Sequence, residues 1–177
     1  LTSALAVALI ALVPRLEIND NFVHYFAKGL EFRDNADFAN DNLTGVYTLE
    51  YSLKSTEAGG IAEPEYMRHL EAFADWFEQQ PHITHVSPVT DIMRRLNLNM
   101  HGDDEAWYRL PEERDLAAQY LLLYEMSLPY GLDLNNQINV DKSATRMTVL
   151  LRDVSTKETK KILAAAETWQ RENLPPH

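Results

Sequence analysis

The sequence predicts an α+β fold: a split strand–helix–strand sandwich of the ferredoxin-like type, with helical insertions. Two observations support this prediction. Segments with the two-residue period of a strand alternate with segments of helical period, and the order strand, helix, strand occurs once in full and then begins again. The 177 residues, 45% of them hydrophobic and 24% charged, have the composition of a globular domain.

The first 43 residues are predicted to precede this domain. Residues 1–13 carry no charge, but a bilayer span needs about 20 apolar residues. No basic stretch precedes them, as it would in a signal peptide. We expect the C-terminal part of a first transmembrane helix, or alternatively a buried helix of a soluble protein. Residues 14–43 form a lead segment with short helices, interrupted near Gly29, in which four apolar residues have helical spacing: Phe22, Tyr25, Phe26 and Leu30.

The first strand–helix–strand unit is the clearest part of the pattern. Residues 44–55 alternate between apolar and polar, which predicts a strand with one buried face. Residues 64–79 predict a helix, because Pro64 suits a first turn and apolar residues recur every three or four positions: Tyr66, Leu70, Phe73 and Phe77. Residues 82–89 predict the second strand. A helical crossover of this kind favours parallel strands.

A helical insertion is predicted over residues 90–128. It consists of a helix to Met100, a polar excursion and a longer helix from Pro111, which is apolar over more than half of its circumference. A helix of that composition is buried on more than one side or presents a face to a partner. A strand at 143–153 and a helix from Ser155 or Thr156 to Asn173 then begin a second unit, with Ile162, Ala165 and Trp169 along its apolar side. Residues 44–177 are therefore expected to form one domain whose final strand is missing.

Composition excludes several functions. The chain has 27 acidic and 16 basic residues, a formal net charge of −11, and such a surface repels the phosphates of nucleic acids. It has no cysteine, which excludes disulfides, thiolate metal sites and cysteine nucleophiles.

Motifs for catalysis are weak or missing. The sequence has no GxGxxG, GxxxxGK[ST] or GxSxG motif. His82 and His85 would point to opposite faces of a strand. The HGDDE run at 101–105 is better explained as a solvated acidic loop, and residues 133–144 lack the turn glycine and final glutamate of a calcium loop. We therefore expect no enzyme activity, no metal and no cofactor.

Longer stretches of the sequence carry a family resemblance. They are NDNFVHYFAKGLEFRDNADFANDNLTG, GGIAEPEYMRHLEAFADWF, HITHVSPVTDIMRRLN, RLPEERDLAAQYLLLYEMSLPYGLDLNNQIN and KSATRMTVLLRD. Together they resemble the first extracytoplasmic, or periplasmic porter, domain of RND superfamily exporters, in the hydrophobe/amphiphile efflux branch with MMPL-like domains.

The resemblance implies a function and a place. Such exporters move hydrophobic or amphiphilic compounds, lipids among them, by proton influx through the bacterial inner membrane. The porter domain would face the periplasm and form part of the substrate passage. Its partners would be a second periplasmic domain, the membrane helices and, in a homo-oligomer, other copies. The proton-relay carboxylates of the family lie in membrane helices that this chain does not contain.

The candidate site lies on the apolar helix of the insertion. Tyr120, Leu123, Tyr124 and Met126 are expected to form a substrate passage or an interdomain surface. Two alternatives stay open. One is a soluble module that binds a hydrophobic ligand or a protein through residues 117–128, and the other is an acidic hydrolase that holds a metal at residues 101–105.

Overall fold

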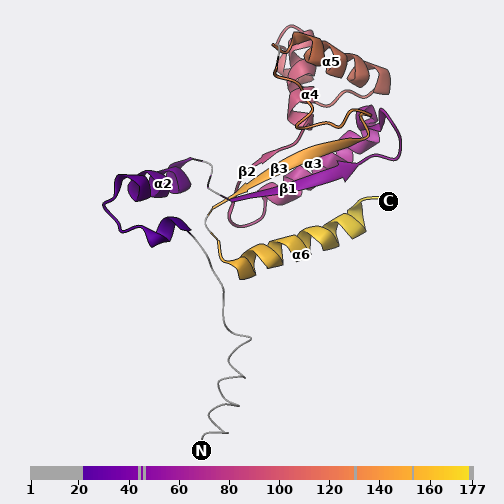
Figure 1. Ribbon diagram of the computed structural model, residues 1–177. Coiled ribbons are helices and arrows are strands. Elements are labelled where there is room, and N and C mark those ends of the chain that lie inside the picture. Colours follow the sequence, from indigo (N-terminus) through magenta and orange to yellow (C-terminus); the bar gives the residue numbers. More distant parts are fainter. Residues whose placement is uncertain (1–21, 44, 46, 130, 153, 176–177) are drawn as a thin grey trace, which may run out of the picture.

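The computed structural model describes residues 22–43, 45, 47–129, 131–152 and 154–175. Within these ranges the fold is α+β, as predicted: five α-helices and short 3₁₀ turns accompany a three-stranded antiparallel sheet (Figure 1). The elements are η2 (Phe22–Tyr25), α2 (Glu31–Asn42), β1 (Tyr47–Lys54), η3 (Gly60–Ala62), α3 (Pro64–Glu78), β2 (Ile83–Ser87), α4 (Thr90–Met100), η4 (Glu105–Trp107), α5 (Arg114–Ser127), β3 (Ala144–Leu151) and α6 (Thr156–Asn173).

The strands lie in the order β1-β3-β2. Strands β1 and β2 each pair antiparallel with β3, so they point the same way, as the crossover through α3 predicts. They are not neighbours, however, because β3 lies between them. The β1–β3 register runs without interruption from Tyr47 opposite Leu151 to Lys54 opposite Ala144, whereas β2 has an irregularity between Ile83 and His85.

The core lies on the side of the sheet where α3 and α6 pack. Alternate residues of β3 are fully buried there, Met147 and Val149 among them. Aromatic rings join three elements: Tyr51 of β1 lies 5.3 Å from Phe73 of α3, and Phe73 stacks at 5.1 Å on Trp169 of α6. The predicted apolar stripe of α3 is therefore confirmed as the side that packs on the core.

The opposite face of the sheet is polar. In β1 every second residue, beginning with Thr48, is exposed. An ion pair of 3.5 Å joins Glu50 of β1 to Arg146 of β3 on this face. The alternation of the sequence thus matches a sheet with one face against the helices and one face toward solvent.

Helices α4 and α5 form a second layer beyond one end of the sheet (Figure 1). The buried Asn97 side chain of α4 joins them: its amide donates to the Arg109 carbonyl at 2.9 Å, and its oxygen accepts from the Tyr120 hydroxyl of α5 at 3.2 Å. Helix α5 begins at Arg114 rather than at Pro111, because Glu113 before it is extended, with φ −117° and ψ 135°.

The last helix, α6, differs from the prediction in one residue of the side that faces the core. Ser155 is the N-cap of α6, and its hydroxyl and the Glu158 side chain form a capping box. The buried side of α6 is formed by Ile162 and Ala166, so the prediction that Ala165 faces the core is wrong. The spacing of four residues from Ile162 follows the helical period better than the predicted spacing of three.

The lead segment contains the short helices that were predicted, η2 and α2, separated by a break at Gly29, which has φ 93°. Among the described residues, no helix combines the length and the apolar character that crossing a membrane requires. The predicted end of a membrane helix, residues 1–13, lies outside the described residues.

Candidate functional site

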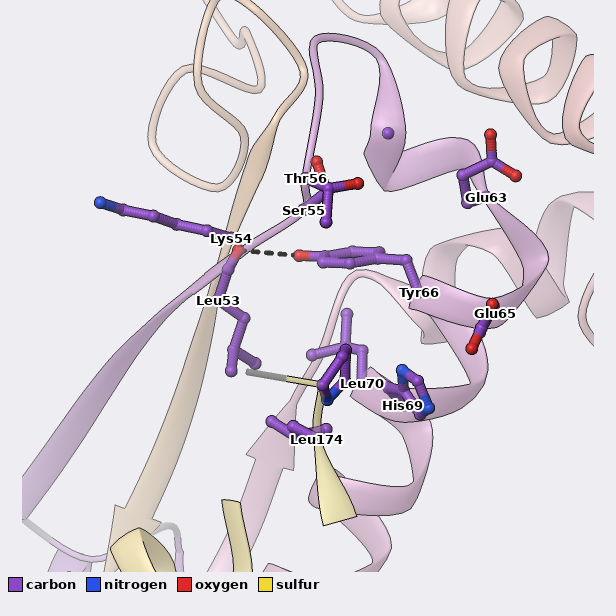
Figure 2. Close-up of a pocket in the computed structure, with 12 residues that line it drawn as sticks. Leu53, Lys54, Ser55, Thr56, Glu63, Glu65, Tyr66, His69, Leu70 and Leu174 are labelled. Atoms are coloured by element: carbon purple, nitrogen blue, oxygen red, sulfur yellow. Dashed lines mark hydrogen bonds between the residues drawn. The ribbon is translucent and has the colours of Figure 1, made fainter. Parts of the chain in front are cut away.

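A cavity of about 240 Å³ lies where the end of β1, the start of α3 and the end of α6 meet (Figure 2). Its apolar wall comes from all three elements: Leu53, Leu70, Leu174 and Pro175. Its polar rim consists of Lys54, Ser55, Thr56, Glu63, Glu65, Tyr66 and His69. An open groove continues from it along β1 and α6 and shares Leu53, Lys54, Leu174 and Pro175. The site is therefore formed by segments more than a hundred residues apart in the sequence.

Tyr66 fixes the geometry of this cavity. It lies in the first turn of α3 and points across to β1, where its hydroxyl donates to the Leu53 carbonyl at 2.9 Å (Figure 2). The same oxygen lies 2.6 Å from the hydroxyl of Thr145 in β3. Burial raises the pKa of Tyr66, against the lowering effect of its bonds to Thr145, so the phenol stays neutral at physiological pH.

Two further polar groups of the rim, Ser55 and Glu63, are engaged in structural contacts. The Ser55 hydroxyl lies 2.9 Å from the Glu57 carbonyl oxygen and 3.0 Å from the Ser143 carbonyl oxygen, and its proton can be donated to either of them. Glu63 forms an ion pair of 2.7 Å with Arg114 at the start of α5. The partners of the Ser55 hydroxyl in these contacts are thus backbone carbonyls, and the apolar wall of the cavity suits an apolar group.

Two tyrosines of the core are expected to respond to Phe substitution with opposite signs. Tyr66→Phe removes the hydroxyl shared by Leu53 and Thr145 and should lower the free energy of unfolding by about 1–2 kcal/mol. The Tyr51 hydroxyl is buried and has no hydrogen-bond partner among the described residues, so Tyr51→Phe should raise the free energy of unfolding by about 1 kcal/mol. Urea unfolding of both variants measures the difference, and equal signs would contradict these contacts.

The same Tyr51 gives a pH dependence. Burial, and to a smaller extent the charge of Glu167, raises its pKa from 10.0 to about 12 in the folded state. The unfolded chain releases this proton near pH 10.0 and the folded chain only near 12, so the free energy of unfolding is unaffected by Tyr51 ionisation below pH 10.0 and falls as the pH rises toward 12. Unfolding between these pH values should be less pH-dependent in Tyr51→Phe, and identical profiles would contradict the shift.

The four residues predicted from the sequence do not form one surface. Tyr120 is buried, and its hydroxyl donates to Asn97 in the layer between α4 and α5. Tyr124 is half-buried and packs against the core. Leu123 and Met126 are exposed, at 43% and 78%, beside the exposed Leu122. The structure thus places Tyr120 in the interior and leaves Leu123 and Met126 as the solvent-facing part of the predicted set.

The candidate metal motifs have other contacts. His101 stacks on Trp107 at 3.7 Å, and Asp104 caps η4 by accepting from the Ala106 amide at 3.0 Å. In the calcium-like segment, Ile138 is buried, and Asp133 accepts from the Asn135 amide. Across the part of the chain that the structure describes, no group of three or more His, Asp or Glu side chains is placed to hold a metal ion.

Comparison of the chain with protein-family models, curated proteins and solved structures finds no significant match. The class of protein that the fold defines is therefore an α+β domain with a three-stranded antiparallel sheet and a cavity at the end of β1. The functional interpretation depends on the site and on the sequence resemblance.

Sequence reasoning missed the cavity. The helical stripe predicts Tyr66 only as one apolar position, and the strand pattern predicts Leu53 in the same way. Nothing in their local spacing indicates that Tyr66 reaches Leu53 and Thr145, because the second contact joins residues 79 positions apart. The apolar residue Leu174, near the end of α6, is the feature of the sequence that could have indicated a third wall of the cavity.

Proposed function

We propose that the chain is part of the periplasmic portion of a proton-driven RND-type exporter of hydrophobic or amphiphilic compounds or lipids. In this proposal the domain contributes to the extracytoplasmic passage and is anchored at the bacterial inner membrane by residues 1–13. The other periplasmic domain and the membrane helices of the same transporter are its partners.

The observation that carries the proposal is the arrangement of the two strand–helix units. Strands β1 and β2, joined through α3, flank β3, which leads into α6. This is the order that a split, ferredoxin-like porter domain would have, and it agrees with the stretches of sequence that resemble RND porter domains. The finer ferredoxin-like assignment includes a fourth strand, for which the outer edge of β1 has room in the described sheet.

Two further features support a role in binding apolar compounds. The cavity at the end of β1 has apolar walls and a rim in which Ser55 and Glu63 are already engaged. Helix α5 presents Leu122, Leu123 and Met126 to solvent. An exposed apolar strip of this kind suits a passage wall or a contact with another domain of the transporter.

Export should depend on this strip of α5. Leu123→Asp and Met126→Asp place a charge on exposed positions, so each should change the free energy of unfolding by less than about 0.5 kcal/mol. Each should nevertheless lower export by the complete transporter several-fold, measured as efflux of a hydrophobic dye from cells. The matched control is Ala72→Asp, at an exposed position on α3 and therefore outside this strip, which should leave export unchanged. Equal efflux from all three variants would show that this strip of α5 is not part of the passage.

The gene gives a direct check of the proposal. A complete membrane helix should be encoded across Leu1, and a block of several membrane helices should follow His177. A reading frame that starts near Leu1 and stops near His177 would contradict it.

A soluble module that binds a hydrophobic ligand or a protein partner is the second candidate. The same exposed strip on α5 favours it, since a strip of this kind can contact a partner outside any transporter. Analytical ultracentrifugation with a hydrophobic dye distinguishes the two. A tight oligomer that binds no amphiphile would favour the interaction module.

A further inference from the structure

Segments η2 and α2 form a small unit that is held together by its own polar contacts. The buried Arg33 side chain of α2 donates to the Val23 carbonyl of η2 at 3.0 Å and to the Asp37 carboxylate at 2.7 Å. The Asp34 carboxylate accepts from the Gly29 amide at 3.0 Å in the connecting turn. This unit stands apart from the sheet and its helices (Figure 1), so its exposed side chains do not contribute to the core of the domain.

One side of the unit is apolar, and its large side chains are not covered by the other described elements. Phe32, Ala36, Ala39 and Leu43 follow each other at spacings of four, three and four residues, which places them along one side of α2. The rings of Phe22 and Phe26 pack on Phe32 at centroid distances of 6.1 and 4.9 Å. We define the aromatic face as these six residues: Phe22, Phe26, Phe32, Ala36, Ala39 and Leu43.

The rings of the aromatic face pack on one another and still remain open to solvent. Phe22 is 61% exposed, Phe32 is 50% exposed and Leu43 is 67% exposed. Large apolar side chains that gather in one place without cover indicate a contact surface rather than scattered surface residues.

The other side of α2 is acidic. Asp34, Asp37 and Asp41 share it, and the one arginine of the helix, Arg33, is paired with Asp37. The unit is therefore amphipathic, with an aromatic side and a negatively charged side on which Phe38 is also exposed. A negative charge on the water-facing side disfavours anionic partners, so a neutral apolar surface fits the aromatic face better than an anionic one.

The position of the unit in the chain indicates what covers the aromatic face. Eight residues, 14–21, separate Phe22 from the uncharged apolar run 1–13, and eight extended residues reach at most about 29 Å. If that run lies in the bilayer, a step that rests on the proposed function, the aromatic face is held within this distance of the membrane surface. Helices that lie in the membrane–water interface carry Trp, Phe and Leu on the side that enters the lipid.

We propose that the aromatic face is a lipid-contacting surface, by which η2 and α2 lie on a membrane of zwitterionic lipid. The rings of Phe22, Phe26 and Phe32 enter the boundary between headgroups and acyl chains. The carboxylates of Asp34, Asp37 and Asp41 face water. The lead segment then holds the domain at a set distance from the bilayer.

Single cysteines in the full 177-residue chain test this surface, because the chain contains no cysteine of its own. Ala36→Cys lies on the aromatic face, and Asp41→Cys, at an exposed position, lies on the acidic side as the matched control. Each is labelled with an environment-sensitive fluorophore and mixed with phosphatidylcholine vesicles that carry a spin-labelled lipid. The label at residue 36 should brighten several-fold on plain vesicles and be quenched by the spin label. The label at residue 41 should do neither, and equal responses at both positions would overturn the proposal.

A third label, at Ala6→Cys, separates this proposal from the proposed function. A lipid signal at residue 6 with none at residue 36 overturns the lipid-contacting surface and leaves the membrane anchor in place. A signal at residue 36 with none at residue 6 supports the surface and contradicts the anchor. Absence of both signals overturns both.

Loss of one ring should weaken the contact. Phe32→Ser should lower the vesicle partition coefficient of the chain by roughly tenfold, as expected for one apolar side chain removed from lipid. Met100→Ser, an exposed position on α4, is the control and should leave partition unchanged. Replacing phosphatidylcholine with phosphatidylglycerol should weaken binding, and tighter binding to the anionic vesicles would contradict the charge argument. An unchanged partition for Phe32→Ser would overturn the proposal.

Discussion

Phe73→Ala is expected to lower the free energy of unfolding by about 3–5 kcal/mol, the range for removing a buried aromatic ring. Phe73 is fully buried, and its ring contacts those of four others: Tyr51, Trp76, Phe77 and Trp169. It therefore joins β1, α3 and α6, and a cavity at this position loosens all three. Urea unfolding followed by circular dichroism measures the change.

The control for this substitution is Phe38→Ala. Phe38 is 62% exposed on α2, so its removal should change the free energy of unfolding by less than about 0.5 kcal/mol. Should Phe73→Ala not fold at all, Phe73→Leu gives a smaller loss, about 1–2 kcal/mol, that remains measurable. A loss below about 1 kcal/mol for Phe73→Ala would show that the three elements do not share one core.

Gly45→Ala is expected to destabilise the domain by about 3 kcal/mol or more, from strain and steric overlap together. Gly45 has φ 79°, a conformation that side chains rarely adopt. A Cβ atom there would also overlap the carbonyl of Leu151 at the end of β3, and this backbone atom cannot move without disturbing the β1–β3 pairing.

Gly131→Ala separates the two contributions. Gly131 has φ 87° but nothing within 4 Å of the position of a Cβ atom among the described residues. Its substitution should cost only the backbone strain, about 1–2 kcal/mol. Thermal unfolding of the two variants gives the difference. Equal losses would contradict the close approach of Gly45 to β3.

Local pattern was enough to predict most elements of the fold. The alternation around Tyr47–Lys54 predicted β1 and its buried face, and the stripe through Leu70, Phe73 and Phe77 predicted the buried side of α3. The order β1-β3-β2 does not follow from the spacing, because β1 pairs with residues about 100 positions away. The two-residue period of the sequence specifies which face of a strand is buried. Which strand lies next to it depends on contacts between residues distant in the sequence.

The candidate site was harder to predict for a related reason. The apolar composition of α5 predicted a helix that is buried on more than one side or presents a face to a partner, and in the structure Leu123 and Met126 face solvent. It could not indicate that Tyr120 turns inward to Asn97, a contact with another helix. The cavity at Leu53 depends in the same way on Tyr66 and Leu174, which the fold brings together from separate elements.

The central claim is that this domain lies outside the cytoplasm as part of a membrane exporter. Ser52→Cys introduces a single exposed thiol on β1, to be made in the product of the complete gene with any other cysteines replaced by serine. Intact cells are then treated with a membrane-impermeant maleimide. The proposal predicts labelling of residue 52 before lysis, in the membrane fraction. Labelling only after lysis would place the domain in the cytoplasm and contradict the account.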